Sequence, residues 1–183
     1  MRESNFQFVK NEVLRQNLDE AFDHILILLP FTDYLIYNGA AKSAFCKTII
    51  IYTASIVEAL LYYVLDNKFT ENEISEFYSN WELKNKQILH TISETHQIVA
   101  GDYQKILSKT GKEKMNLGQV SDFLNAKKVI NSSLAVKLDI IRKLRNEQHI
   151  GTHKKVKIYS KNDLETSFSI ARDVKEFVMK TIK

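Results

Sequence analysis

The sequence predicts an all-α protein, an up-down bundle of five to six helices. Three observations predict this class. Glycine (5 residues) and proline (1 residue) are scarce, which argues against a turn-rich β-sandwich or barrel. Hydrophobic residues (44%) and charged residues (26%) stand near the averages of soluble globular proteins. An apolar spacing near 3.6 residues, the mark of amphipathic helices, recurs through almost the whole chain.

We expect one domain over residues 1–183, because no repeat, Ser/Gly linker or low-complexity tract divides the sequence. The lone Cys46 excludes an internal disulfide and fits a reducing compartment. The first residues lack the apolar core of a signal peptide, so we expect a cytoplasmic protein. The net charge of +4 is a mild excess that identifies no partner by itself.

The first helix, or pair of helices, is expected over about residues 6–29, where Pro30 interrupts it. A second helix over about residues 40–66 is apolar on nearly every side, as in a helix surrounded by others. Its stretch 48–65 is about long enough to span a bilayer, but a carboxylate near the middle, Glu58, is costly in lipid. We therefore expect the central helix of a soluble bundle and no membrane partner.

Residues 70–73 (Thr-Glu-Asn-Glu) have the spacing of a capping box and open a third helix. Apolar residues at helical spacing predict that this helix packs into the core, and they are Ile74, Phe77, Trp81, Ile88 and Ile92. The periodicity then fails, which predicts an irregular or small β excursion around residues 101–116.

A short helix is expected over about residues 117–126. Asn131 then caps a helix that reaches about residue 148 or 149, before Gly151 ends it. Residues 154–159 are expected to be irregular or a short strand. Residues 162–165 (Asn-Asp-Leu-Glu) resemble a second capping box for a last helix. Its inward face is expected to carry Leu164, Phe168, Ala171, Val174 and Val178.

The helix that begins near Ser132 carries the most informative pattern. Leu134, Leu138 and Ile141 share one face. At 100° per residue, Arg145 falls about 20° from Leu134, His149 about 60° and Arg142 about 80°. An arginine on a core-facing stripe must be paired or must open onto a cleft, because burying it unpaired costs several kcal/mol.

Two simpler explanations stay open at this point. The face can emerge into solvent at the C-terminal end of the helix, where the helix dipole favours cations. Alternatively, Arg145 forms a structural ion pair, for which Glu58 of the apolar helix is the natural partner. From residue 142 to residue 161, lysine and arginine far outnumber the one acid, Glu147, and taken alone this run is a solvated loop.

The run from Ile140 to Gly151 resembles the signature of the HEPN superfamily (higher eukaryotes and prokaryotes nucleotide-binding domain). These all-α domains carry an arginine, four to six further residues and then a histidine near the end of a late helix. Arg145-Asn146 resembles their arginine-asparagine pair, and His149 stands where the histidine belongs. Three residues separate Arg145 from His149 and six separate Arg142 from it, so both arginines stay candidates. An earlier apolar helix with one acid, Glu58, also fits.

The resemblance implies a HEPN-like bundle that acts as a metal-independent endoribonuclease, usually as a homodimer, without a cofactor. His149 would be the general base or acid, and Arg145 or Arg142 would stabilise the scissile phosphate. Asn146 and Glu58 would support them. The residues that would bind RNA around the site are Lys143, His153, Lys154, Lys155 and Lys157. A toxin or phage-defence effector with a cognate antitoxin is the role this resemblance implies.

No metal site is expected. His149 and His153 are four residues apart, but Gly151 breaks the helix between them and no carboxylate or cysteine completes a ligand set. Three functions therefore remain open. They are the ribonuclease, a non-catalytic HEPN-like module that binds RNA or nucleotide or mediates dimerisation, and a helical scaffold in which Arg145 pairs with Glu58.

Overall fold

A computed structural model of the protein describes residues 3–34, 38–147 and 157–182. The chain forms two compact units. Residues 1–68 and 116–183 make one, which we call the helical unit, and residues 69–115 make the other, the hairpin unit. Most of the described residues are helical and one two-stranded sheet is present among them, which confirms the mainly helical class. The single domain over residues 1–183 stays a prediction.

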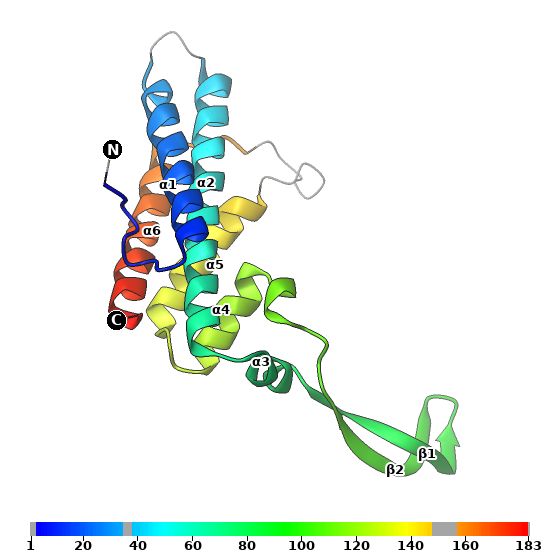
Figure 1. Ribbon diagram of the computed structural model, residues 1–183. Coiled ribbons are helices and arrows are strands. Elements are labelled where there is room, and N and C mark those ends of the chain that lie inside the picture. Colours follow the sequence, from blue (N-terminus) through cyan, green and yellow to red (C-terminus); the bar gives the residue numbers. More distant parts are fainter. Residues whose placement is uncertain (1–2, 35–37, 148–156, 183) are drawn as a thin grey trace. The chain divides into compact units, whose positions relative to one another are not determined.

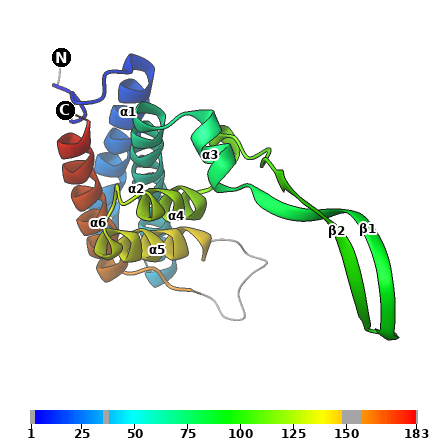
Figure 2. The ribbon, with the colours of Figure 1, turned by 90° about the horizontal axis from the view of Figure 1, so that it is seen from below.

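The helical unit contains α1 (Glu12–Leu28), a 3-10 turn (Leu29–Thr32), α2 (Gly39–Lys68), α4 (Leu117–Ala126), α5 (Ser132–Asn146) and α6 (Lys161–Thr181). The helices α1, α2 and α6 run side by side, and α5 runs obliquely to α2 (Figures 1 and 2). The central helix is α2, which contacts α1, α4, α5 and α6. The predicted bounds of α2 and α4 are confirmed, while α1 begins at Glu12, later than expected.

The apolar surface of α2 explains its central position. It is long and apolar enough to cross a membrane, but 61% of its most apolar window is buried inside the protein, as in the core helix of a bundle. Its buried residues cover more than half of the helix circumference and include Ile49, Val57, Leu60 and Val64. Its buried Thr53 donates its hydroxyl proton to the carbonyl of Ile49 at 2.8 Å, so this hydroxyl does not oppose burial.

Side-chain caps fix the starts of the helices. Asn131 accepts a hydrogen bond from the amide of Leu134 at 2.8 Å, as the sequence predicts. The predicted capping box at residues 162–165 is wrong, because α6 is capped two residues earlier by Ser160. The Ser160 amide donates to Asp163 Oδ2 at 2.8 Å, and the Asp163 amide donates to Ser160 Oγ at 3.4 Å. Ser160 and Asp163 have the same spacing as Asn162 and Glu165, a capping residue followed three positions later by an acid. The earlier of these two patterns starts the helix.

The hairpin unit begins with α3 (Glu71–Phe77), which has the predicted capping box between Thr70 and Glu73. The prediction that this helix continues through Ile92 is wrong. Strand β1 (Asn80–Ser93) pairs antiparallel with β2 (His96–Ile106), and a short 3-10 turn follows at Lys112–Lys114. The excursion expected around residues 101–116 therefore starts at Asn80, and its strands end at Ile106.

The β-branched and aromatic content of residues 80–106 explains the strands, because such residues favour extended backbone. A bulge interrupts the pairing between Lys84 and Gln87, and Asn85 there has a positive φ of 49°, which asparagine tolerates. Opposite the bulge, a Cβ at Gly101 would lie 2.5 Å from the carbonyl oxygen of Lys84. Glycine at this position therefore permits the close approach of the two strands.

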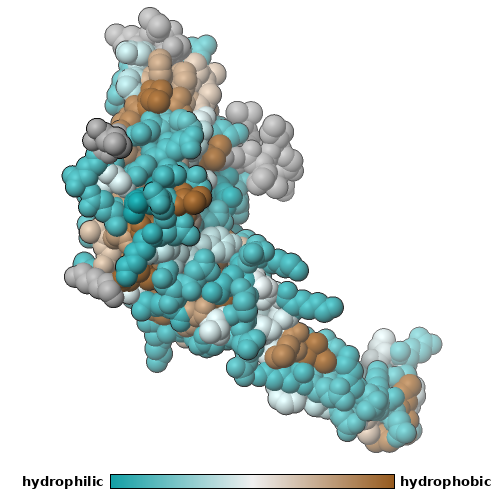
Figure 3. Space-filling view, viewed as in Figure 1, coloured by the Kyte–Doolittle hydropathy of each residue, from teal (hydrophilic) through white to brown (hydrophobic). Residues whose placement is uncertain are grey.

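The hairpin exposes most of the apolar residues that were expected in the core. Trp81 is 64% exposed, Ile88 57% and Ile92 61%, whereas Ile74 in α3 is fully buried. Figure 3 shows hydrophobic patches on the hairpin unit. The predicted core role is therefore wrong for the part of the stripe that lies in β1 and for Phe77 in α3, which is 40% exposed, and it is confirmed for Ile74.

This division predicts effects of very different size on stability for two similar substitutions. Ile74→Ala removes a buried side chain and should lower the free energy of unfolding by about 2–5 kcal/mol. Ile88→Ala, its matched control in β1, should change it by about 0.5 kcal/mol or less, because surface substitutions rarely cost more. Urea unfolding followed by circular dichroism measures both values. Equal losses for the two variants would contradict the exposed position of Ile88.

Candidate functional site

The C-terminal half of α5 carries the candidate site. The predicted inward face is confirmed, with Leu134 8%, Leu138 1% and Ile141 fully buried. Leu144 is also buried, so the buried face of α5 is wider than the stripe of Leu134, Leu138 and Ile141. The prediction that the helix reaches residue 148 or 149 is wrong, because α5 ends at Asn146 with Glu147 as its C-terminal cap. His149, where the predicted continuation of the helix ends, lies outside the described residues, as do His153, Lys154 and Lys155.

Arg145 follows the apolar face of α5 and forms an ion pair with Glu58 of the central helix, α2. Its Nη1 atom lies 2.8 Å from Oε2 of Glu58, and the two side chains are 38% and 19% exposed. The ion pair left open by the sequence is thus present. Since Glu58 is the more buried partner, removing Arg145 leaves a carboxylate that water solvates only in part. The pair fixes the position of Arg145 relative to α2.

The pair also affects Tyr62, which lies one turn after Glu58 on α2. Burial raises the pKa of the Tyr62 hydroxyl, the negative charge of Glu58 raises it further, and Arg145 opposes both effects. The ionisation of this tyrosine therefore reports on the charges of the Glu58–Arg145 pair.

Arg142 serves a different carboxylate from Arg145. Its Nε donates to Asp139 Oδ1 at 3.0 Å, its Nη2 contacts the same oxygen, and Lys143 lies 2.7 Å from the other oxygen of Asp139. These hydrogen bonds, that of Lys143 first, lower the pKa of Asp139 below its usual value. Asp139 is a partner that the sequence reasoning missed, although its i,i+3 and i,i+4 spacing is the signal for such pairs.

A cavity of about 360 Å³ lies beside Arg142, between α4 and α5. Besides Arg142 and Asp139, the start of α4 lines it with Asn116, Gly118 and Gln119. A Cβ at Gly118 would lie 3.4 Å from Cδ of Arg142, which is ordinary van der Waals contact and places the Arg142 side chain beside the start of α4. Arg142 and Arg145 therefore occupy separate surroundings, one beside this cavity and the other against α2.

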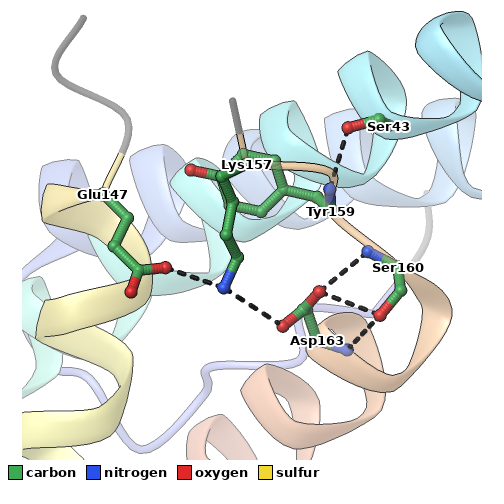
Figure 4. Close-up of polar contacts among 6 residues, drawn as sticks. All are labelled: Ser43, Glu147, Lys157, Tyr159, Ser160 and Asp163. Carbon is green, nitrogen blue, oxygen red and sulfur yellow. Dashed lines mark hydrogen bonds and ion pairs between the residues drawn. The ribbon is translucent and has the colours of Figure 1, made fainter. Parts of the chain in front are cut away.

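The remaining candidates near the end of α5 differ in exposure. Asn146 is exposed, and the Lys143 side chain is 65% exposed. Lys157 is paired with two carboxylates of the same chain, because its Nζ lies 2.8 Å from Glu147 and 3.8 Å from Asp163 (Figure 4). The hydrogen bond with Glu147 raises the pKa of Lys157.

The Lys157 cluster joins three helices. Glu147 caps α5, Asp163 belongs to the first turn of α6, and the amide of Tyr159 donates to Oγ of Ser43 on α2 at 2.8 Å (Figure 4). Tyr159 is 5% exposed, and its pKa is raised first by burial and then by Glu147. The chain therefore leaves α5 and returns to α6 through fixed contacts on both sides of residues 148–156.

Two arginines provide cations for an anionic ligand: Arg142 beside the cavity, and Arg145 against α2. The Glu58 contact engages Nη1 of Arg145 and leaves its other N–H donors without a partner among the described residues. A guanidinium with donors to spare and 38% exposure can bind a phosphate oxygen. Within the described ranges, no three His, Cys, Asp or Glu side chains form a group that could hold a metal ion.

Comparison of the chain with protein-family models, curated proteins and solved structures finds no match.

We expect the Glu58–Arg145 pair to contribute measurably to stability. In a double-mutant cycle with Glu58→Gln and Arg145→Gln, the coupling should be about 1 kcal/mol, above most exposed pairs because Glu58 is largely buried. The control cycle uses Lys137 and Asp173, a pair 2.5 Å apart whose side chains are 43% and 29% exposed, and it should give about 0.5 kcal/mol or less. Urea unfolding measures both couplings. A coupling near zero for Glu58 and Arg145 would contradict a stabilising pair.

Tyr62 provides a second, electrostatic readout of the same pair. Glu58→Gln should lower the pKa of Tyr62, because it removes a negative charge that disfavours the phenolate. Arg145→Gln should raise it, because it removes the opposing cation. Carbon-13 NMR of labelled tyrosine, assigned with Tyr62→Phe, measures the shift. Movement of the pKa in the same direction in both variants would exclude the charge effect.

Proposed function

We propose that the protein is a metal-independent endoribonuclease of the HEPN type. The observation that carries the proposal is the Glu58–Arg145 contact of 2.8 Å, which positions a partly exposed guanidinium four residues before His149. The resemblance of residues 140–151 to the HEPN signature supplies the reaction class. The two residues are four positions apart in the sequence, and α5 ends at Asn146, so the proposal that both reach a single phosphate rests on this short separation rather than on a shared helix face.

In this reaction, His149 takes the proton from a 2′-hydroxyl of RNA. The 2′-oxygen then bonds to the adjacent phosphorus, the bond from phosphorus to the 5′-oxygen breaks, and that oxygen leaves with a proton from an acid. Arg145, or Arg142 in its place, stabilises the negative charge on the phosphate oxygens. Asn146 and Glu58 position these groups. The acid is His149 of a second copy if two sites share one cleft.

The proposal includes RNA or a nucleotide as ligand and a homodimer as the working form. It also includes a cognate antitoxin as partner and the cytoplasm as compartment. Lys143, His153, Lys154 and Lys155 would contact phosphates beside the site. Lys157 would contribute less, since its charge is already balanced by Glu147 and Asp163.

A second candidate is a non-catalytic HEPN-like module that binds RNA or nucleotide or mediates dimerisation. The observation that favours it is that Arg142, Arg145 and Lys157 are each paired with a carboxylate of the same chain. A cation that neutralises a neighbouring acid has a structural role whether or not it binds a phosphate.

Cleavage of RNA in the presence of EDTA separates the two candidates. The wild-type protein should cut a mixed-sequence RNA, and His149→Ala should lower the rate about 10²-fold or more, because a general base contributes that much. His96→Ala, which changes an exposed histidine of β2, should retain the wild-type rate. Arg145→Lys should keep more activity than Arg145→Ala, since lysine keeps the charge without the planar fork.

Each outcome of this assay has one meaning. RNA binding without cleavage by the wild-type protein would favour the binding module. Cleavage that persists in His149→Ala would exclude His149 as the base, and neither binding nor cleavage would leave the scaffold role of the Glu58–Arg145 pair.

A further inference from the structure

An apolar cavity of about 300 Å³ lies within the helical unit, between α1, α2 and α6. No residue of the α5 site lines it. Its walls are aromatic and aliphatic, and they include Phe22, Ile25, Ile56, Leu60 and Phe168. The cavity is open to solvent on part of its boundary, so a ligand can enter it without the helices separating. A dry apolar cavity of about 150 Å³ is already enough to bind benzene.

Apart from the two cations described below, the wall of the cavity carries few polar groups that could hold water. Thr53 is the hydroxyl-bearing residue that lines it, and its proton is already donated to the carbonyl of Ile49 at 2.8 Å. Asn5, from the segment before α1, lies at the edge, where its amide donates to Asp19. Because water needs two to four polar partners to be held in a cavity, an alkyl group is the better occupant.

Two cations of α6 stand at the same cavity. Arg172 and Lys175 line it from neighbouring turns of the helix, and neither forms an ion pair with a carboxylate among the described residues. Lys175 Nζ lies 5.4 Å from the ring centroid of Phe6, which also lines the cavity. An aromatic ring beside an ammonium group keeps the charge at the apolar wall without neutralising it. The cations and the hydrocarbon walls together match an anion with an apolar tail.

We propose that this cavity binds a medium-chain fatty acid, with the alkyl chain between α1, α2 and α6 and the carboxylate at Arg172 and Lys175. The volume equals roughly ten water-sized groups at about 30 Å³ each, the size of an alkyl chain of about eight to ten carbons. Arg172 provides planar N–H donors for the two carboxylate oxygens, and Lys175 provides a point charge. The site does not depend on the proposed ribonuclease activity.

Calorimetric titration with ligands that share one tail tests the head-group part of the proposal. Decanoate should bind at least tenfold more tightly than decanol, and decylammonium should bind more weakly than both. Lengthening the acid from hexanoate to decanoate should tighten binding about fourfold for each methylene until the cavity is filled. Equal affinity for decanoate and decanol, or no saturable binding of decanoate, would overturn the proposal.

Variants of α6 test the location. The double change Arg172→Glu and Lys175→Glu should weaken decanoate binding at least tenfold and leave decanol binding within twofold. Lys180→Glu, a charge reversal on the same helix outside this cavity, is the matched control and should leave both affinities within twofold. Decanoate binding that survives the double change would overturn the assignment of the two cations.

A cavity-filling variant tests the tail without altering charge. Ala171→Leu adds hydrocarbon at the wall between the two cations and Phe168, and it should weaken decanoate and decanol at least tenfold each. Thermal unfolding of the variant shows that it is folded, and filling a cavity should keep or raise its melting temperature. Unchanged affinities in a folded Ala171→Leu protein would overturn the proposal. Binding of the wild-type protein to phosphatidylglycerol vesicles without binding to monomeric decanoate would also overturn it.

Discussion

The burial of α2 is the constraint on which the helical unit depends. A 30-residue helix that is apolar on nearly every side cannot face water, so it must be covered from several directions. The coverage comes from α1, α4, α5 and α6, whose own apolar faces point to it. Glu58 is the exception on this surface. Arg145 pairs with its carboxylate, and this ion pair constrains the position of the C-terminal end of α5 relative to α2.

The chemistry of the α5 site follows from the same constraint. Hydrophobic burial brings the helices together without direction, whereas an ion pair between Glu58 and Arg145 requires one register. A guanidinium placed in this way is held against α2 by Glu58. The proposed ribonuclease and the proposed binding module both start from this one contact.

The sequence predicts the helical unit well and the hairpin unit poorly, and the difference has a physical cause. In α2 and α4, the apolar period and the helix ends agree with the prediction, and in α5 the period and the Asn131 cap agree although the helix ends at Asn146, earlier than predicted. After Phe77, the residues Trp81, Ile88 and Ile92 fall at helical intervals, but the β-branched and aromatic residues between them favour strands. The spacing of the apolar residues alone does not distinguish a helix from a strand in this segment.

The ion pairs show the same limit. Arg142, Lys143 and Asp139 lie on one helix at fixed spacing, so their contacts are readable from the sequence. Glu58 is readable as the partner because it is the one acid within the apolar stretch 48–65. The pairing of Lys157 with Glu147 depends on how the chain returns to α6, which the local sequence does not determine. The positions of His149, His153, Lys154 and Lys155 remain sequence predictions.

The contact between Glu147 and Lys157 has a consequence for how the chain tolerates changes in length. It ties together two points ten positions apart, so the helices on either side are anchored independently of what connects them. For a tethered connection, the entropic cost of added residues grows only logarithmically, about 0.6 kcal/mol for each doubling. Insertions or deletions between these anchors should therefore be accommodated without disturbing α5 or α6. In related sequences, this is where length variation would be accepted most readily.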